Sequence, residues 1–520
     1  MNTISQAYKD GISSIRAQFD TPPELLLSGP SPDRMWTPSL AGAIHSFQKE
    51  LGAEKSPLTG TEPVIITGQQ PGMFTGPLYT ILKAITTIQA AEALGRQGKP
   101  CIPLFWVAGD DHDFDEVRTT HFLDRRCQIR SLTYEAHEPY ANTSDIPMYR
   151  MPLSDKVHEL IDTASSSCWN SELTAGVVSF LHDSLDDARS LSHWFCLIMA
   201  RLFSRTDLRL FQPSIEAARK ASIPVLRKEI ENPLHSTRLL IQEGEKLVLL
   251  GFKAPIQRNA DACNFFIEVE GHRRNVTYQQ GKYLVRGCGL SYTVDEMHAL
   301  LDASPERFSP NVALRPVVQQ LLFAPVAYVG GPGEIDYWAQ LKPLFSFFEL
   351  PMPIVYPRLR AVISTVKLNR LLGYYNITKD DLAAQSDLLT RFLHRGRDLD
   401  LSRTFMEDRA HVEEAMNIMV SRLTAPTASE SLKKAAKACR RHGQFHLDKL
   451  ERALLYADKE RRTTAESRLQ RLTNAFYPFN LPQERVFCIF SFLFRHGWPL
   501  IEHMIHEFDF SSDTMQELEL

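Results

Sequence analysis

The sequence predicts an α/β fold built on a doubly wound parallel sheet with insertions, together with an all-helical antiparallel coiled-coil domain. Two apolar runs, Val64–Ile66 and Ile102–Ala108, are typical of buried parallel strands because polar residues do not alternate within them. A glycine-rich turn and then apolar residues at helical spacing follow the first run. Residues 376–476, in contrast, carry almost no strand signal and contain two long amphipathic runs.

Size and composition narrow the class of protein. A chain of 520 residues is too long for one hydrophobic core and should form two or three domains. Its 43% hydrophobic and 23% charged residues are ordinary for a soluble globular protein, and a net charge of −4 gives no electrostatic case for nucleic acid. The longest apolar block, Val486–Phe494, is too short for a membrane span, so we expect no membrane partner.

The eight cysteines are scattered, and no two of them have C-x-x-C spacing. This pattern argues against a disulfide framework and against a zinc site, and it favours reduced thiols. Residues 1–20 lack the apolar segment of a signal peptide. We therefore predict a cytoplasmic protein without zinc.

The first strand–turn–helix unit follows residues 1–60, which are polar and interrupted by prolines and to which we assign no chemistry. Backbone amides in such a turn can face an anion. Glycine turns also join strands to helices without any ligand, and this one matches neither standard phosphate-loop pattern, so both interpretations stay open. The candidate cofactor-binding residues here are Gly68, Gln69, Gln70, Thr75, Gly76, Pro77 and Tyr79.

A dense group of ionisable residues, Asp110–Glu116, comes directly after the second apolar run. Crowded carboxylates repel each other unless solvent, a cation or a shared proton relieves them. One interpretation is an acidic helix N-terminus capped by His112. The other is a site in which Asp110 and Asp111 lie near a Mg²⁺–nucleotide or a substrate amine, His112 accepts a proton, and Asp113 orients it. The candidate catalytic residues are thus Asp110, Asp111, His112 and Asp113.

Residues 150–310 are predicted to be a large insertion of helices and β-hairpins. The chain then returns to the core with the strand Val326–Val329, a second glycine turn at Gly330–Gly333, and a last core strand at Pro353–Arg358. Strands separated by helical runs favour a parallel sheet with right-handed crossovers, so both glycine turns should face one crevice. The second turn adds the candidate cofactor-binding residues Gly330, Gly331, Gly333 and Glu334.

Charged residues beside the predicted core strands are candidates for binding the substrate. Arg315 and Arg358 lie near predicted strand ends, and Asp336 follows the second glycine turn. For Lys83 and Lys342, a solvated side chain is the expected state.

The runs Phe405–Leu423 and Ser429–Leu472 predict a helical hairpin or antiparallel coiled coil, with a turn at residues 424–428. The apolar seam residues are Leu447, Leu450, Leu454 and Ala457, while Arg461 and Arg468 fall on the same seam. Two arginines weaken an intramolecular zipper, so we predict a homodimer through this hairpin.

The strings ITGQQPGMFTGPLYT and FWVAGDDHDFDEV resemble signature stretches of the bacillithiol-biosynthesis cysteine-adding enzymes, a family of cysteine ligases. The similarity runs from about residue 60 to the end of the chain and rests on several separated motifs in order. This family is similar to class I aminoacyl-tRNA synthetases and related nucleotidyltransferases. The resemblance therefore implies a Rossmann-like core with connecting insertions and an appended coiled coil that pairs subunits.

The resemblance also implies roles for three stretches. Thr75–Tyr79 occupies the place of the relatives' first nucleotide-binding signature, Gly109–Asp113 that of the acidic strand end, and Gly330–Glu334 that of the glycine turn near the adenosine. Neither a HIGH tetrapeptide nor a KMSKS-like loop after Tyr356 is present. Those residues stabilise the adenylation transition state in the synthetases, so the route of activation stays open.

The function implied is a ligase that joins the carboxyl group of L-cysteine to the amine of glucosaminyl-malate, the last step of bacillithiol biosynthesis. Amide formation in water needs an activated acyl group, so we expect ATP with Mg²⁺. One alternative is a nucleotidyltransferase or ligase that acts on another small anionic substrate. Another is a non-catalytic scaffold whose helical hairpin is the working part.

The expected domains are a nucleotidyltransferase-like core at residues 1–375, a helical coiled-coil domain at residues 376–476, and a segment at residues 477–520 that returns to the core.

Overall fold

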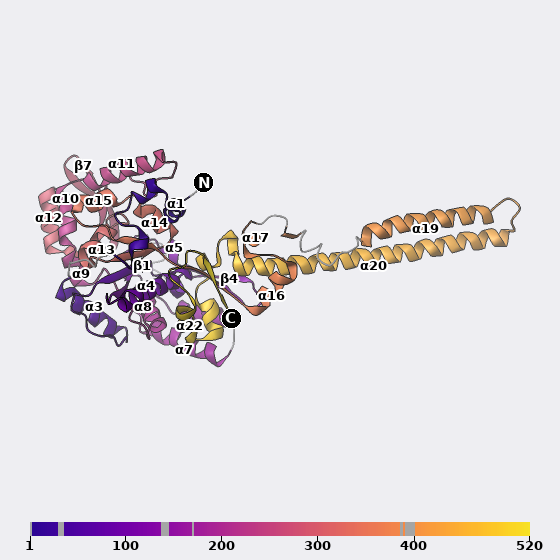
Figure 1. The fold of residues 1–520 in the computed structure, drawn as a ribbon, viewed down its shortest axis with the longest axis horizontal. Coiled ribbons are helices and arrows are strands. Elements are labelled where there is room, and N and C mark those ends of the chain that lie inside the picture. The colour runs from indigo at the N-terminus through magenta and orange to yellow at the C-terminus, as the bar shows by residue number, and fades with distance from the viewer. Residues whose placement is uncertain (1–2, 30–35, 137–144, 169–170, 385–387, 390–400) are drawn as a thin grey trace. The chain divides into compact units, whose positions relative to one another are not determined.

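The computed structural model describes residues 3–29, 36–136, 145–168, 171–384, 388–389 and 401–520 (Figure 1). It divides into two compact units. The first comprises residues 1–125, 129–363 and 481–519, and the second comprises residues 126–128, 364–480 and Leu520. Each unit is described here by itself.

A five-stranded parallel sheet forms the centre of the first unit, with the strand order β12-β11-β1-β2-β5. The strands are β1 (Val64–Gln69), β2 (Ile102–Val107), β5 (Arg209–Phe211), β11 (Ala327–Gly330) and β12 (Ile354–Pro357). Four of them coincide with the apolar runs that predicted core strands, which confirms the parallel α/β core. Strand β1 continues past the predicted run, because Thr67, Gly68 and Gln69 pair with Phe105, Trp106 and Val107 of β2.

Strand β5 lies within the stretch predicted as an insertion, yet it pairs with β2 at the edge of the central sheet. Its three residues are buried and are preceded by the helices α6 (Lys156–Cys168), α7 (Glu172–Asp186) and α8 (Leu191–Leu202). The chain therefore crosses back to the core within this stretch, and only the residues after β5 form the second sheet.

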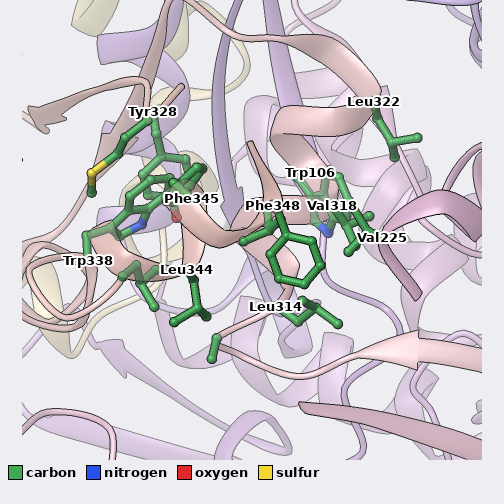
Figure 2. Close-up of a cluster of buried hydrophobic side chains, with 14 of the residues drawn as sticks. Trp106, Val225, Leu314, Val318, Leu322, Tyr328, Trp338, Leu344, Phe345 and Phe348 are labelled. Atoms are coloured by element: carbon green, nitrogen blue, oxygen red, sulfur yellow. The ribbon is translucent and has the colours of Figure 1, made fainter. Parts of the chain in front are cut away.

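Helices cover the central sheet and bury its apolar side chains. Helix α4 (Tyr79–Arg96) contacts β1, β2 and β11, and most of its residues are buried. In the core shown in Figure 2, the ring of Trp338 stacks with two other rings. The distance between ring centres is 4.7 Å to Tyr328 and 5.7 Å to Phe345. The helices that carry this core are α13 (Arg315–Phe323), α14 (Pro332–Trp338) and α15 (Lys342–Phe348).

A second, antiparallel sheet has the order β10-β6-β7-β8-β9. Its strands are β10 (Phe308–Pro310), β6 (Ala262–Val269), β7 (His272–Gln279), β8 (Lys282–Val285) and β9 (Ser291–Tyr292). The predicted hairpins of this region are thus confirmed. The helices of the same region are α9 (Glu216–Ala221), α10 (Ile223–Glu231), α11 (His235–Leu249) and α12 (Val294–Ala303).

The two ends of the chain complete the first unit. The remaining N-terminal and connecting elements are α1 (Ile4–Lys9), α2 (Ser13–Arg16), α3 (Pro38–Glu50), α5 (Phe114–Val117), β3 (Thr119–Leu123), β4 (Ile129–Thr133) and β13 (Arg360–Ser364). The C-terminal elements are α21 (Phe490–His496), α22 (Pro499–Glu507) and β14 (Met515–Glu519). Helix α21 packs against α7 and β3, so the C-terminal segment contributes to the core of this unit.

The second unit is helical in the part that the structure describes. Its elements are α16 (Val366–Tyr375), α17 (Lys379–Ala384), α19 (Leu401–Leu423) and α20 (Glu430–Phe476). Helices α19 and α20 form the predicted antiparallel hairpin, which confirms the coiled-coil domain (Figure 1). Residues 390–400 of the predicted domain, and the side chains of Ala457 and Arg461 on its predicted seam, lie outside the described residues.

Candidate functional site

A cavity of about 790 Å³ opens at the carboxyl ends of the central strands. Ligands of open α/β sheets bind at this edge, and the volume suits small molecules. Its walls come from β1 and α4, the segment after β2, the hairpin β6–β7, the start of α13, the turn after β11, and the end of β12. The lining residues are Gly68, Gln69, Gln70, Tyr79, Lys83, Trp106, Ala108, Asp110, Asp111, His112, Glu116, Pro213, Arg258, Phe266, Arg273, Pro310, Asn311, Val312, Arg315, Tyr328, Gly331, Pro332, Gly333, Glu334, Tyr337, Arg358 and Arg485.

Gly68 is required where β1 and β2 approach most closely. A Cβ atom at this position would lie 2.8 Å from the backbone oxygen of Trp106. The next two residues, Gln69 at the end of β1 and Gln70 after it, line the pocket. The glycine therefore lets the end of β1 form the floor of the cavity beside β2.

Lys83 links the two glycine turns. Its ammonium donates to the oxygen of Gly68 and to Oε1 of Gln69, both at 2.9 Å, and forms an ion pair with Glu334. The side chain is 3% exposed, so the expectation of a solvated lysine is wrong. Burial lowers the pKa of Lys83, and the carboxylate of Glu334 opposes that shift. Lys83 lies in the first turns of α4, which begins at Tyr79, and from there its side chain reaches back to the end of the strand that precedes the helix.

Glu334 holds the second turn together. Its Oε2 accepts from the backbone N–H of Gly331 at 2.8 Å, and its Oε1 accepts from the Tyr328 hydroxyl. Burial raises the pKa of Glu334, but the charge of Lys83 and these hydrogen bonds outweigh it and hold the pKa below its ordinary value. The amide of Gly331 is thus already bonded to protein, and Lys83 and Glu334 together fix the ends of β1 and β11.

The acidic residues after β2 are bonded to protein rather than open. Both carboxylate oxygens of Asp110 accept from the guanidinium of Arg219, with Nη1 3.0 Å from Oδ2, and the two side chains are 10% and 5% exposed. Oδ1 of Asp111 accepts from the backbone N–H groups of His112 and Asp113 at 2.7 and 3.2 Å, and its Oδ2 accepts from Gln70 at 2.7 Å.

These bonds determine how well the acids fit a metal ion. Every carboxylate oxygen of Asp110 and Asp111 already accepts at least one hydrogen bond. No group of three or more His, Cys, Asp or Glu side chains in the described part of the chain is arranged to hold a metal ion. The carboxylates of Asp110 and Asp111, which one interpretation placed near a Mg²⁺–nucleotide or a substrate amine, are therefore already hydrogen-bonded to the protein. Asp113 is exposed and does not line the pocket.

His112 faces a guanidinium. Its Nδ1 lies 3.2 Å from Nη1 of Arg273, its Nε2 lies 3.8 Å from Asp145, and its ring meets the edge of Phe266. Burial and the charge of Arg273 lower the pKa of His112, so the imidazole is neutral at pH 7. Nδ1 then accepts from Arg273, which leaves the proton of the ring on Nε2. His112 is not the predicted helix cap, because Asp113 occupies the N-cap position of α5.

Arg315 and Arg358 both line the cavity, as their positions near strand ends predicted. The guanidinium of Arg315 lies 5.6 Å from the ring centre of Trp106 and donates to the hydroxyl of Tyr337 at 3.3 Å and to Gln319 at 3.1 Å. Arg358 forms an ion pair with Glu484 at 2.8 Å, and both side chains are buried. Its Nε is buried and has no hydrogen-bond partner among the residues that the structure describes.

Several predicted site residues lie outside the pocket lining. Thr75 and Gly76 have φ angles of 70° and 69°, and they turn the chain between β1 and α4 without reaching the cavity. Pro77 and Gly330 likewise do not line it. Asp336 is committed elsewhere, since its Oδ1 accepts from the backbone N–H of Ser5 at 2.6 Å.

Sequence reasoning missed several cations of the pocket. Arg273 lies on strand β7, Arg258 on the segment before β6, and Arg485 after the helical domain in the sequence. None follows a predicted core strand, so the strand-end rule could not find them. The only sequence signal was the string HRRN in a predicted hairpin, and it does not say which arginine points toward the central sheet.

The balance of charge in the pocket is positive. Lys83 is paired with Glu334, Arg358 with Glu484, and Asp110 with Arg219. Among the described residues, four lining cations have no ion pair with a carboxylate, whereas two lining carboxylates, Asp111 and Glu116, remain and both accept from Gln70. The four cations are Arg258, Arg273, Arg315 and Arg485. The cavity therefore suits an anionic ligand.

Comparison with known families agrees with the two-part architecture. The N-terminal Rossmann-like domain of bacillithiol biosynthesis BshC matches residues 43–359. The C-terminal coiled-coil domain of the same family matches residues 361–520. Together the two matches span nearly the whole chain.

Curated relatives from several bacteria are similar over most of their length. Each of the following is named "putative cysteine ligase BshC". The relative from Bacillus cytotoxicus is 28% identical over 89% of this chain and 86% of its own. That from Salinibacter ruber is 28% identical over 85% and 80%, and that from Symbiobacterium thermophilum is 29% identical over 90% and 87%.

Among solved structures, one from Campylobacter jejuni described as a "putative arginyl t-RNA synthetase" covers 86% of this chain and 99% of its own. Its sequence identity is 9% and its TM-score 0.22, which is too low to support a shared fold. The relation to class I synthetases stays a prediction. Within the described residues, no helix combines the length and apolarity that a membrane span requires.

Proposed function

The chain belongs to the BshC family of bacillithiol biosynthesis, and on that premise we propose that it is a cysteine ligase acting in the cytoplasm. It would join the carboxyl group of L-cysteine to the amine of glucosaminyl-malate, the last step of bacillithiol biosynthesis. The observation that supports this proposal most directly is the cavity at the strand ends, whose unpaired cations outnumber its unpaired carboxylates. Glucosaminyl-malate carries two carboxylates and cysteine one, so both substrates match that charge.

Amide formation requires that the cysteine carboxyl be activated, and we propose that ATP supplies the activation. In one route the carboxylate displaces pyrophosphate from ATP, and the amine then displaces AMP. In the other the carboxylate takes the γ-phosphoryl group, and the amine displaces phosphate. In both routes the amine loses one proton as the amide forms. The cationic groups that could face phosphate oxygens are Arg315, Arg485 and the unpaired Nε of Arg358.

Magnesium would reach this pocket with the nucleotide. Because Asp110 and Asp111 are already hydrogen-bonded, phosphate oxygens and water would supply most of its ligands, as Mg²⁺ commonly arranges. No step of the proposal depends on a protein-held metal.

His112 is the candidate acceptor of the amine proton. It is neutral near pH 7 and lines the cavity, whereas Asp110 is neutralised by Arg219 and Asp111 holds a turn. For His112 to accept a proton at Nδ1, the hydrogen bond from Arg273 must be given up.

The proposal is tested by incubating the purified protein with L-cysteine, glucosaminyl-malate and ATP, and by detecting the amide product with mass spectrometry. Reactions that lack ATP, or that contain serine in place of cysteine, are the controls. We expect product only in the complete reaction, with AMP or ADP formed in equal amount. Product without ATP would reject the proposed activation, and no product above the uncatalysed rate would reject the ligase.

A second candidate is a nucleotidyltransferase or ligase for another small anionic substrate, because the surplus of cations in the pocket does not specify which anion binds. Thermal unfolding in the presence of each ligand separates the two candidates, since a ligand that binds only the folded state raises the melting temperature. Stabilisation by a sugar phosphate, without any by cysteine or glucosaminyl-malate, would favour this second function.

We further propose that the protein is a homodimer through helices α19 and α20. Several large apolar side chains of this hairpin are exposed within the single chain, among them Val412 at 44%, Ile418 at 46% and Leu450 at 56%. A second copy would offer the same apolar surface, as two-fold dimers do.

A further inference from the structure

Arg273 carries a buried charge that forms no direct ion pair with a carboxylate of the described residues, although the nearby charges of Asp110 and Asp111 raise its pKa. It is 7% exposed, and it lies on strand β7 of the antiparallel sheet while lining the cavity of the parallel sheet. Its Nε donates to Oγ of Ser309 at 2.9 Å, its Nη2 to the oxygen of Pro310 at 2.7 Å, and its Nη1 faces Nδ1 of His112 at 3.2 Å. All three partners are neutral.

The orientation of this guanidinium is fixed. Its centre lies 3.7 Å from the ring centre of Phe266, so an aromatic face covers one side of the plane. The three hydrogen bonds use three of the five N–H groups of an arginine and hold the plane from its edges. Two N–H groups therefore remain, on a side chain that is already in place for a planar acceptor.

A buried guanidinium charge is energetically unfavourable unless an anion pairs with it. A buried, unpaired cation destabilises the folded state of most proteins. Burial accordingly lowers the pKa of Arg273 to about 10, although the group stays charged at pH 7. Arg219, another buried arginine near the cavity, differs because Asp110 forms an ion pair with it. The protein thus leaves Arg273, and not Arg219, for a ligand.

We propose that Arg273 binds a carboxylate of the amine substrate and so selects an acceptor that carries a malate-type group. This inference rests on the proposed ligase function. An arginine fork matches the planar carboxylate, and the two remaining N–H groups of Arg273 can donate to its two oxygens. The acceptor's carboxylate would then lie next to His112, which shares Arg273 as a partner.

The first experiment measures the binding of L-malate by calorimetry to the wild-type protein, Arg273→Gln and the matched control Arg307→Gln. Arg307 directly precedes strand β10 of the same sheet, donates to the oxygen of Glu268 at 2.9 Å and does not line the cavity. We expect equal affinity for wild type and Arg307→Gln, and a loss of about 10- to 100-fold in Arg273→Gln. The affinity of Arg273→Lys for L-malate should fall between those of the wild type and Arg273→Gln, because lysine keeps the charge but not the fork. This intermediate affinity would show that the weaker binding does not come from loss of the fold.

The second experiment measures kinetics with glucosaminyl-malate and with methyl glucosaminide, which lacks both carboxylates. In Arg273→Gln we expect KM for glucosaminyl-malate to rise about 10- to 100-fold, KM for cysteine to stay unchanged, and the preference for the malate-bearing acceptor to disappear. Malate binding that Arg273→Gln leaves intact, or no malate binding by the wild type, would overturn the inference even if ligation occurs. Malate binding that depends on Arg273, in a protein that ligates no amine, would overturn the ligase and leave the carboxylate site standing.

Discussion

Buried ion pairs lie around the pocket, whereas the ion pairs of helices α19 and α20 are more exposed. Arg219 with Asp110, and Arg358 with Glu484, are each nine-tenths or more buried on both sides. In the hairpin, Arg409 pairs with Glu413, Asp448 and Glu451, but these acids are 33% to 50% exposed. Water can replace a lost partner in the hairpin and cannot do so beside the pocket.

The burial of the ion pairs differs between the pocket and the hairpin, and this difference indicates different roles for the two regions. Buried pairs fix the ends of β1, β2, β11 and β12, so the pocket keeps its shape without a ligand. The hairpin instead leaves apolar side chains in solvent, which a second copy could cover.

The largest effect is expected from Asp110→Ala, which removes the counter-ion of Arg219. An unpaired buried charge costs about 3–5 kcal/mol, so the urea midpoint should fall steeply. Asp448→Ala in the hairpin is the matched control, because it also removes an aspartate from an arginine, and it should leave the midpoint unchanged. Equal effects of the two substitutions would contradict the contrast.

A smaller, pH-dependent effect is expected at Glu229 on helix α10. Its Oε1 accepts from Ser236 at 2.7 Å, its Oε2 has no partner, and burial raises its pKa from 4.5 to about 7. Between these values the folded state holds a proton that the unfolded state has lost, so stability decreases as pH rises through this window. Relative to Glu229→Gln, the wild type should lose up to about 3 kcal/mol between pH 4.5 and pH 8.

The measurement is the urea midpoint of both proteins across that pH range. Glu216, an exposed acid on α9, provides the control, because Glu216→Gln should change no more with pH than the wild type does. A difference between wild type and Glu229→Gln that stays constant with pH would show that Glu229 is ionised throughout.

His112 should give a weaker effect of opposite sign. Burial and Arg273 lower its pKa below 6.5, so the unfolded state binds its proton first as pH falls. Stability that is present above pH 6.5 is therefore lost below it, and His112→Gln should remove this part of the acid dependence. Nuclear magnetic resonance titration of His112 provides the independent check. A midpoint at or above 6.5 would contradict the lowered pKa.

The smallest effect on the first unit is expected from the hairpin. Replacing Leu447, Leu450 and Leu454 together by aspartate should leave the unfolding of the first unit unchanged and convert a dimer into a monomer. Light scattering at micromolar concentration measures the mass of both proteins. A monomeric wild-type protein would contradict the proposed dimer through helices α19 and α20.

The same contrast explains how much the sequence could predict. The strands β1, β2, β11 and β12 and the helices α19 and α20 follow from local apolar patterns, and all were predicted within a few residues. The partners of the charged groups do not follow from local patterns. Arg219 is 109 residues from Asp110, and Arg273 is 161 residues from His112. Only the folded chain brings them together.

The acidic residues Asp110–Glu116 illustrate that the sequence predicts the position of a charged group but not its partner. Its position after β2 predicted correctly that Asp110, Asp111 and His112 would line the cavity, but not that Arg219 would neutralise Asp110. The burial of Lys83 was not predicted either. A lysine four residues into a helix resembles a solvated side chain, and only the neighbouring turn of β11 supplies the carboxylate that buries it.

Whether the reaction takes place in the cavity at the strand ends is tested most directly by the rate of cysteine transfer to glucosaminyl-malate. Mass spectrometry measures this rate for the wild type, for Arg315→Ala and for the hairpin variant with three aspartates. Arg315 lines the pocket without a carboxylate partner, so its removal should lower kcat/KM about 100-fold, while the hairpin variant keeps the wild-type rate per chain. That result would locate the reaction in the cavity at the strand ends. A wild-type rate in Arg315→Ala, or a loss confined to the hairpin variant, would contradict it.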